Sequence, residues 1–521
     1  MHKINKIYWE RVNLHLCFSK KVNVNKAYLV SDNIKIEIPI NNNELIINVT
    51  NTPEGEMLDK GNWLIVVEDE RVILEKDLLN ILEDKSRIFN YQNNKYAYLV
   101  HLKANEDMSL VININFMLEN KKYKKKYSFS NEKGINKIKV LFVLLFLLFI
   151  NIFYYFVRLI SFNKNKKVVF ITENGTDLSG NLEKLYNSID ENKWKKKKIA
   201  IDAFDKNNQS KFRKVINYFK EIIVAGSANN IIIDNYTLVF TYLNLSRNVK
   251  LIQVWHAGVG FKSVGYARFG LDGSPHPYIS SHRKYTYVIV DQDSLIPIYK
   301  EVFGTPSSIF RSYGMPRLDN YLDMSMITDS VDELENINPL ITKKKIILFS
   351  PTYRGNGNTD AFYDYSLINL SKIYNFCKKN GFIFIIKMHP FIKEKIKIDS
   401  KYSDLIFDYS NLDINKLIYV SDIMITDYSS CAYEFSLFNR PLIFYRFDKE
   451  LYEYLRPMHT VDLFTSKQYE VRDFVSLLEV LETLKNIDIN KRFCNIDNNS
   501  RKNVCKKIIE LLGDNNENNN R

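Results

Sequence analysis

Ionisable and hydroxyl side chains follow several apolar runs of this chain at the point where each run ends. His256 follows the run at 251–255, and His389 comes shortly after the run at 382–387. If these runs are parallel strands, their carboxyl ends share one edge of a sheet, where such sheets bind ligands. Two further runs, at 346–349 and 423–426, lead into Ser350-Pro351-Thr352-Tyr353-Arg354 and Asp427-Tyr428-Ser429-Ser430.

The two histidines each lie near a lysine, Lys262 after His256 and Lys387 before His389. A lone histidine is more often structural. Phosphoryl transfer, however, needs a base near the attacking hydroxyl, and cations or hydrogen-bond donors around the phosphate. We therefore expect His256 and His389 to be catalytic, one from each lobe of the chain and acting across a cleft. Lys387 is a candidate contact for the donor, and Lys262 for the acceptor phosphate.

Two arginines and a serine pair add candidate phosphate contacts. Arg354, on the donor side, and Arg317, on the acceptor side, can each bind a phosphate through two parallel hydrogen bonds. Ser429 and Ser430 precede a predicted helix at 430–438. Serine in that position often only caps the helix, but the same free N–H groups bind anions. The order of strand, serines and helix favours a phosphate site.

Two carboxylates flank this serine pair. Asp427 precedes it and is a further candidate for the donor site. Glu434 lies inside the predicted helix, where it either binds a ribose or acceptor hydroxyl or is a solvated helix residue. The chain contains no DxD, HExxH or Cys/His spacing suited to a metal. The sequence therefore predicts metal-independent chemistry without a cofactor.

The composition indicates a polyanionic partner. The formal net charge is +13, which favours an anionic membrane or an anionic polymer, although a lysine-coated soluble surface has the same composition. Nucleic acid is not expected, because the motifs of nucleic-acid-binding modules are missing. The five cysteines form no CxxC pair or disulfide framework, which is typical of a reducing compartment.

The apolar pattern divides the chain into four predicted regions. Residues 1–130 alternate short β-rich runs with turns, which predicts a small β-sandwich whose role is either accessory, in polymer binding, or structural. Residues 131–163 contain an apolar helix. Residues 164–330 and 331–521 alternate strands and helices, which predicts two Rossmann-like domains of an α/β, GT-B-like architecture. The first domain's strands are expected at 168–172, 199–203, 222–225, 238–242, 251–255 and 287–290; the second's at 346–349, 382–387, 423–426 and 442–445, after an irregular connection at 322–343.

Residues 140–157 contain no charged side chain and would form a helix about 27 Å long, close to the minimum for crossing a bilayer. A simple span conflicts with the positive-inside rule, because the lysine-rich flank and the nucleotide-using half would both have to be cytoplasmic. We therefore expect a peripheral or re-entrant helix at the cytoplasmic face of the membrane. A buried core helix remains the alternative.

The motifs together resemble the CDP-glycerol glycerophosphotransferase family, the teichoic acid polymerases. The resemblance extends over about 250–460, in the family's order, and through 441–454 with Asp448 and Tyr452. It rests on Gln253-Val254-Trp255-His256-Ala257-Gly258-Val259-Gly260-Phe261-Lys262, Gly314-Met315-Pro316-Arg317-Leu318-Asp319, Ser350-Pro351-Thr352-Tyr353-Arg354, Lys387-Met388-His389-Pro390 and Ser421-Asp422-Ile423-Met424-Ile425-Thr426-Asp427-Tyr428-Ser429-Ser430.

The resemblance implies a GT-B fold, a membrane-associated enzyme, a CDP-polyol donor and a lipid-linked polyol-phosphate acceptor. The family's catalytic histidines correspond to His256 and His389, and its phosphate-binding serines to Ser429 and Ser430. Many members read WHGTPLK where this chain has WHAGVGFK, a loop longer by one residue. The opening at 6–12 and the β-rich domain resemble the ribitol-phosphate branch.

The function that follows is transfer of a polyol phosphate, from CDP-glycerol or, alternatively, CDP-ribitol, onto a teichoic-acid-type chain. A nucleotide-sugar glycosyltransferase on the same fold is a second alternative, because fold alone does not determine function. The Trp255-His256 motif with KMHP and DYSS argues against it. Retention of both histidines and the serine pair argues against a degenerate polymer-binding protein.

Overall fold

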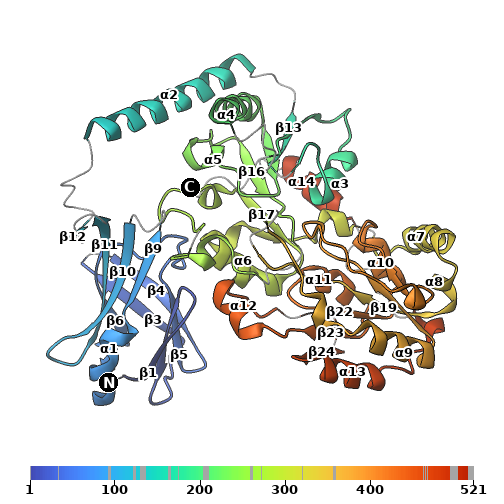
Figure 1. The fold of residues 1–521 in the computed structure, drawn as a ribbon. Helices are drawn as coiled ribbons and strands as arrows, with labels where there is room; N and C mark the ends of the chain where they lie inside the picture. Colours follow the sequence, from blue (N-terminus) through green and yellow to red (C-terminus); the bar gives the residue numbers. More distant parts are fainter. Residues whose placement is uncertain are drawn as a thin grey trace. The chain divides into compact units, whose positions relative to one another are not determined.

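The structure is a computed structural model and describes residues 2–513 except 33, 92–95, 121–124, 129–136, 162–165, 174, 203–209, 258–261, 272, 320, 356–359, 462, 464, 466 and 493–502; side chains at 117–140 are also outside the description. The chain forms two compact units. The first comprises residues 1–256, 263–316 and 505–521, and the second comprises residues 257–262 and 317–504. Figure 1 shows the elements of both.

The amino-terminal β-rich region forms one continuous sheet that encloses a single apolar core. Alternate residues of its strands point inward, as in β4, where Ile36, Ile38 and Ile40 are buried. Neighbours pair in the order β8-β1-β2-β5-β4-β3-β6-β11-β10-β9, with β12 beside β11 and β7 beside β6. The elements are β1 Lys3–Glu10, β2 Asn13–Phe18, β3 Lys26–Ser31, β4 Ile34–Asn41, β5 Glu44–Asn48, β6 Gly61–Val67, β7 Glu70–Arg71, β8 Ile73–Leu74, α1 Leu82–Lys85, β9 Arg87–Tyr91, β10 Tyr96–Ala104, β11 Leu110–Asn120 and β12 Lys125–Ser128.

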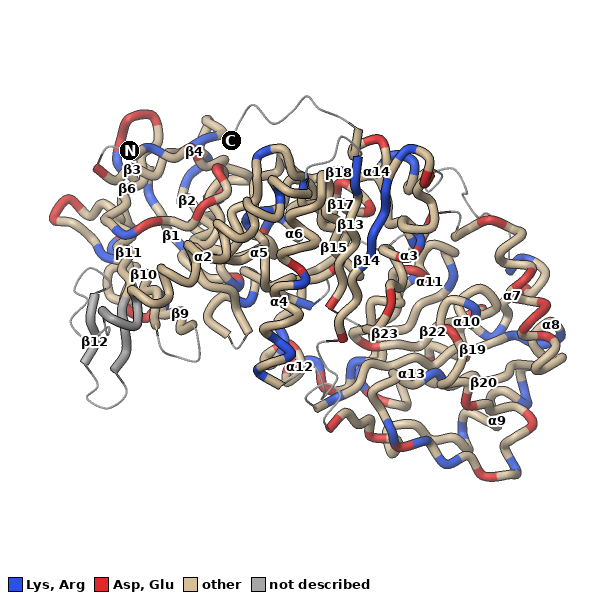
Figure 2. Tube along the Cα trace, turned by 90° about the horizontal axis from the view of Figure 1, so that it is seen from above, with Lys and Arg blue, Asp and Glu red and all other residues tan. Residues whose placement is uncertain are grey.

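The first unit also contains a parallel six-stranded sheet in the order β14-β13-β15-β16-β17-β18. Its edge strand β14 carries Lys195 to Lys198, visible as a blue stretch in Figure 2, and such lysines discourage pairing with another chain. The strands are β13 Lys167–Thr172, β14 Lys195–Ala200, β15 Asn230–Ile233, β16 Lys250–Gln253, β17 Tyr287–Val290 and β18 Phe310–Ser312. The helices are α3 Gly180–Ser188, α4 Lys211–Gly226, α5 Val239–Tyr242, α6 Ile296–Phe303 and α14 Val504–Gly513.

Two predicted strands of this sheet are wrong. Residues 222–225 end helix α4, which begins after Ser210, whose hydroxyl accepts a hydrogen bond from the Arg213 N–H. Residues 238–242 lie in the short helix α5. The strand between them is β15, whose residues are all buried. A short apolar run fits either a buried strand or one face of a helix, so periodicity alone did not separate them.

The β-rich region and the parallel sheet are joined within the first unit by buried polar and aromatic contacts. Arg11 Nε donates to the Glu301 carboxylate at 2.7 Å, and Asn51 donates to the Lys300 and Thr305 carbonyls. Phe269 belongs to the apolar core of the β-rich region and stacks on Phe89. The β-rich region is therefore built into the first unit.

The apolar segment forms helix α2, Lys137–Ser161, and packs along α4. Its buried stripe is Ile150, Tyr154 and Val157, and a Cβ at Gly226 of α4 would lie 2.8 Å from Val157 Cγ1. Only a glycine permits this close approach. Most of the other apolar side chains from Leu141 to Ile160 of α2 are exposed. Because 17% of Leu141–Ser161 is buried, the alternative of a buried core helix is not supported.

The second unit contains another parallel six-stranded sheet, in the order β21-β20-β19-β22-β23-β24. The strand order reverses between β19 and β22, which is the point where doubly wound sheets bind ligands. The expected irregular stretch at 322–343 is instead helical, because Asp323 caps α7. The strands are β19 Lys345–Phe349, β20 Phe382–Ile386, β21 Ile406–Asp408, β22 Ile423–Thr426, β23 Leu442–Tyr445 and β24 Gln468–Val471. The helices are α7 Met324–Ile337, α8 Leu340–Lys343, α9 Leu370–Asn380, α10 Ile414–Val420, α11 Cys431–Ser436, α12 Lys449–Leu455 and α13 Phe474–Thr483.

The carboxyl-terminal helix α14 returns to the first unit, although the sequence placed it in the second half. Leu511 and Leu512 are buried, and Lys250 Nζ at the start of β16 donates to the Leu511 carbonyl at 2.5 Å. The Asn230 side chain at the start of β15 donates to the Leu512 carbonyl. Burial of an apolar helix face and these two bonds account for its position.

Candidate functional site

His256 follows β16 through a constrained turn in the first unit. Trp255, between the strand and the histidine, has a φ of 48°, a conformation that is rare and strained for a bulky residue. The Gln253 side chain accepts a hydrogen bond from the Trp255 N–H at 2.8 Å, and Asn181 donates to the carbonyls of Val254 and Trp255 at 3.1 and 2.6 Å. Two buried amide side chains therefore hold the turn that presents His256.

The imidazole of His256 is exposed, and its hydrogen bond to the backbone indicates which nitrogen is protonated. Nδ1 lies 3.1 Å from the backbone carbonyl oxygen of Asp234, at the end of β15. A carbonyl oxygen only accepts, so Nδ1 is the protonated nitrogen of the neutral ring. Nε2 then carries the lone pair of a general base. Sequence reasoning did not identify Asp234 or Asn181, because their contacts cross between elements far apart in the sequence, and it gave Gln253 no role of its own.

In the second unit the two halves of the sheet meet at Asp427, which follows β22. Its Oδ1 accepts hydrogen bonds from the N–H groups of Thr352 and Tyr428 at 2.8 and 2.6 Å. Its Oδ2 accepts from Arg354 Nη1 at 2.9 Å. Asp427 is 1% exposed and so joins the loops after β19 and β22, instead of facing a ligand as the sequence suggested.

Arg354 is likewise committed to protein partners. Its Nε and Nη2 bind the two oxygens of Asp448 at 2.7 and 3.0 Å, besides the bond to Asp427. Burial disfavours the guanidinium charge, but the two carboxylates raise the pKa of Arg354 above its ordinary value. Its bidentate contact is to Asp448, and the predicted contact to phosphate stays a prediction. Arg354 positions the loops of the site.

His389 and Lys387 follow β20 at the same edge of the sheet. Nδ1 of His389 accepts a hydrogen bond from the Phe391 N–H at 3.2 Å, so the neutral ring carries its proton on Nε2. Burial, with the nearby charges of Lys262 and Lys387, lowers the pKa of His389 to about 4. At neutral pH the ring is therefore an uncharged hydrogen-bond donor.

The two lysines near His389 are partly or wholly buried. Lys387 is 7% exposed and donates to the Ser410 carbonyl at 2.8 Å. Burial lowers the pKa of both Lys387 and Lys262, against the opposing effect of neighbouring carboxylates such as Asp427 for Lys262. An ammonium has three donors, so Lys387 can bind a phosphate while keeping its bond to Ser410. A bound phosphate would favour the charged form of each lysine.

Ser430 and Ser429 begin α11 as expected, but Ser430 does not cap it. The Ser430 side chain is exposed and makes no capping hydrogen bond. The Ser429 hydroxyl accepts from the Cys431 thiol at 3.0 Å. The helix is shorter than predicted, ending at Ser436 instead of 438. The capping interpretation of the serine pair therefore loses its support, and the ligand interpretation stays a prediction.

Glu434 and Arg317 form an ion pair within the second unit. Glu434 is 3% exposed, so it is neither the solvated helix residue nor the open ligand contact that the sequence allowed. Arg317, predicted to contact the acceptor phosphate, is held by this carboxylate. Breaking a buried pair from one side leaves an uncompensated charge, which costs about 3–5 kcal/mol. Both residues therefore stabilise the unit.

The structure brings nine of the ten predicted site residues into the second unit and places His256 in the first. In the second unit, side-chain atoms suited to a ligand remain on Lys387, His389, Ser429 and Ser430. Lys262 lies near His389. The other four predicted residues of this unit bind protein partners. In the described residues, no group of three or more His, Cys, Asp and Glu side chains could hold a metal ion. Metal-independent chemistry stays a prediction.

Replacing Ser429 and Ser430 with Ala is expected to weaken donor use without abolishing it, because the backbone N–H groups remain. Two lost hydrogen bonds to a charged group, at about 1.5–3 kcal/mol each, correspond to a loss of about 10²–10⁴-fold in kcat/KM for the donor. Because Ser430 makes no capping bond, the melting temperature without ligand should hardly change. Thermal melts with CDP test this: an undiminished CDP-induced shift would assign the nucleotide to another site.

Known proteins are similar to this chain in both sequence and fold. Residues 153–510 match the sequence model of the family described as CDP-Glycerol:Poly(glycerophosphate) glycerophosphotransferase. The teichoic acid ribitol-phosphate polymerase TarL of Staphylococcus aureus (strain NCTC 8325 / PS 47) is 29% identical over 500 residues, covering 86% of this chain and 87% of that protein. The teichoic acid poly(ribitol-phosphate) polymerase of Bacillus spizizenii (strain ATCC 23059 / NRRL B-14472 / W23) is 34% identical over 293 residues, 56% of this chain and 46% of that protein.

Among solved structures, the wall teichoic acid polymerase TagF matches with a TM-score of 0.50 and 20% identity, covering 71% of this chain and 94% of that chain. This likeness confirms the predicted α/β, GT-B-like fold. The sequence match extends over most of the chain and includes His256, His389 and the serine pair. It confirms the predicted family and enzyme class, and a CDP-activated donor fits that class. The chain belongs to the CDP-glycerol:poly(glycerophosphate) glycerophosphotransferase family.

Proposed function

We propose that this enzyme transfers a polyol phosphate from a CDP-polyol to the end of a lipid-linked polyol-phosphate chain in teichoic-acid-type synthesis. The observation that carries the proposal is the edge of the second sheet, where Lys387, His389, Ser429 and Ser430 follow β20 and β22 within the segment that matches the family. Hydrogen-bond donors and a cation at the switch point of a doubly wound sheet suit a nucleotide diphosphate.

The reaction needs one base and one set of phosphate contacts. The hydroxyl of the acceptor chain attacks the phosphorus that bears the donor's polyol; a new P–O bond forms there, the bond to CMP breaks, and CMP leaves. Nε2 of His256 accepts the hydroxyl proton. His389 Nε2–H, Lys387 and the serine hydroxyls donate to the phosphate oxygens, where charge builds up. No cofactor or metal takes part in this scheme.

The donor polyol is proposed from the relatives. Of the two relatives described above, TarL matches more of this chain, and it is named a ribitol-phosphate polymerase. The family description instead names glycerophosphate. The likeness to TarL covers 86% of this chain, more than the 153–510 segment of the family model, and this favours CDP-ribitol over CDP-glycerol. Incubation of the purified protein with CDP-glycerol, CDP-ribitol and a UDP-sugar, each with a lipid-linked acceptor, tests the proposal by the nucleotide released. CMP is expected, and UDP alone would instead support a glycosyltransferase.

We place the enzyme at the cytoplasmic face of the membrane, bound through the exposed side of α2. Phe142, Leu148, Phe156 and Leu159 on that side are 67%, 58%, 56% and 77% exposed. Such a surface is unfavourable in water and favours burial among lipid chains. Because α2 lies along α4, a perpendicular span would draw the charged helix α4 into the bilayer. An orientation in the plane of the interface avoids that cost.

Replacing Leu148 and Phe156 together with Glu is expected to lower binding to anionic vesicles at least roughly tenfold, because each buried large apolar side chain contributes about 1.5–3 kcal/mol. Co-sedimentation of the full-length protein with vesicles measures this. Val475→Glu on α13, at a residue that is 60% exposed, is the matched control and should bind like the wild type. Equal binding of the double variant and the control would rule out α2 as the anchor.

A further inference from the structure

A cavity of about 1210 Å³ lies in the first unit, between the β-rich region and the parallel sheet. Thr286 precedes β17, Ser308 precedes β18 and Val249 precedes β16, so the cavity lies at the amino ends of these strands. His256 follows the carboxyl end of β16. Because the strands are parallel, the cavity and His256 are at opposite edges of the same sheet. The cavity is therefore separate from the site described above.

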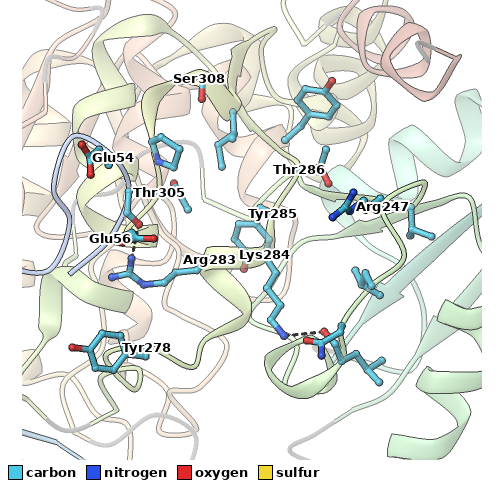
Figure 3. A pocket seen from close by; sticks show the side chains of 18 of the residues that line it. Glu54, Glu56, Arg247, Tyr278, Arg283, Lys284, Tyr285, Thr286, Thr305 and Ser308 are labelled. Atoms are coloured by element: carbon cyan, nitrogen blue, oxygen red, sulfur yellow. Dashed lines mark hydrogen bonds between the residues drawn. The ribbon is translucent and has the colours of Figure 1, made fainter. Parts of the chain in front are cut away.

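Side chains of both charge signs line the cavity, as Figure 3 shows, and Arg283, beside Glu56, donates to the Gly55 and Thr50 carbonyls. Glu54 and Glu56 come from the β-rich region and are exposed. Arg247, Lys284 and Arg311 come from the loops and strands of the parallel sheet. A ligand that is anionic over its whole surface would be repelled by the two carboxylates. A phosphodiester flanked by hydroxylated carbons suits both charge signs, because its phosphate faces the cations and its hydroxyls donate to the carboxylates.

Two side chains of the cavity have hydrogen-bonding capacity for such a ligand. Thr305 is 2% exposed, and its hydroxyl has no hydrogen-bond partner within the part of the chain that the structure describes. A buried hydroxyl without a partner is costly. The oxygen is shielded from solvent, so it meets a polar ligand in the cavity by rotation about the Cα–Cβ bond of Thr305. Lys284 Nζ donates to the carbonyls of Thr241 and Leu243 at 3.0 and 2.8 Å, which uses two of its three donors.

The cavity wall is attached directly to α2. Asn151 of α2 donates to the Tyr242 carbonyl and accepts from the Asn244 N–H at 2.7 Å, and the Tyr154 hydroxyl accepts from the Ser246 N–H at 3.2 Å. The loop 243–249, which lines the cavity, is thus held by the helix that we place at the membrane. A ligand that is tethered to lipid, or is itself a lipid headgroup, would be found at this position.

We propose that this cavity is a second, non-catalytic binding site for a polyol phosphodiester. The inference rests on the proposed function, because that function supplies such a ligand. Two sources share this chemistry: the polyol-phosphate chain that the enzyme extends, and the headgroup of phosphatidylglycerol. A site that holds the chain behind the reacting end would keep the acceptor bound between successive additions.

Two substitutions test the site with little risk to the fold. Arg247→Ala removes an exposed cation, and Thr305→Val replaces the buried hydroxyl with a methyl of the same shape. The matched control is Lys193→Ala, which removes an exposed cation elsewhere in the same unit. The probes are a six-unit oligo(ribitol phosphate) without lipid, and phosphatidylcholine vesicles with and without phosphatidylglycerol, each titrated into the full-length protein.

Each variant is expected to bind one probe about tenfold to hundredfold more weakly than the wild type, the effect of one hydrogen bond to a charged group. Loss with the free oligomer identifies the chain as the ligand, and loss only with phosphatidylglycerol vesicles identifies the headgroup. CMP release with a short acceptor should stay at the wild-type rate. Wild-type binding of both probes by both variants would overturn the site alone, whereas absent CMP release in the wild type would overturn the proposed function.

Discussion

Replacing His256 with Ala is expected to lower turnover by about 10²–10⁴-fold, the usual contribution of a positioned general base. The imidazole is exposed at the end of β16, and the Asp234 carbonyl holds the proton on Nδ1, which leaves Nε2 to accept the proton of the acceptor hydroxyl. KM for the donor should change little, because the donor contacts are assigned to other residues. Steady-state measurement of CMP release in the presence of acceptor gives both constants.

The control for this variant is His101→Ala, at a partly exposed histidine of β10 in the β-rich region. It should retain wild-type turnover. Both variants should melt near the wild-type temperature, because both histidines are at least partly exposed and the Nδ1 atom of His256 bonds to a backbone carbonyl group that water can also serve. Turnover of the His256 variant within a factor of a few of the wild type would remove this residue from the mechanism.

Replacing His389 with Ala is expected to lower kcat/KM for the donor by about 10²–10³-fold, the usual effect of removing one preorganised donor from a developing negative charge. Its Nδ1 is occupied by the Phe391 N–H, so Nε2–H is the donor that the variant loses. His389→Gln is the informative partner, because its amide N–H group can replace Nε2–H and should recover part of the loss. Equal defects in both variants would show that the ring does more than donate a hydrogen bond.

The pH dependence separates a neutral from a charged His389. The pKa of about 4 leaves the free enzyme's ring neutral at pH 7, so kcat/KM should not fall through its deprotonation between pH 6 and 8. Folding stability follows the sign of a lowered histidine pKa: the unfolded chain binds a proton near pH 6.5 and the folded one does not, so stability falls as pH drops from about 6.5 toward 4. His389→Gln should lack this part of the acid destabilisation, and an unchanged acid profile would contradict the assignment.

The strand ends that carry the chemistry were predictable from sequence because polar motifs follow runs of buried apolar residues. The runs before Asp427 and His389 are strands β22 and β20 as expected. The predicted secondary structure is wrong where a short apolar run fits either a strand or a helix, as at 222–225, which belongs to helix α4. There the neighbouring residues from Ser210 onward extend the helix, and the buried strand is the four-residue run of β15.

The individual roles were harder to predict than the location of the site. Residue type identifies Arg354, Arg317 and Glu434 as groups that can bind a ligand, but it does not show that each already has a charged partner. Arg354 binds Asp448, which is 94 residues away in the chain, and Arg317 binds Glu434, 117 residues away. Such pairs arise only when the fold brings distant elements together, and without an alignment the sequence contains no signal for them.

The most direct test of polyol phosphate transfer is to count both products of one reaction. The full-length enzyme is incubated with lipid-linked acceptor and a CDP-polyol labelled in the polyol, and CMP and polymer-bound label are measured together. One label should enter the polymer for each CMP released, with CDP-ribitol or CDP-glycerol as the effective donor. Release of CMP with the label left in free polyol phosphate, or label transfer only from a UDP-sugar, would contradict the proposed function.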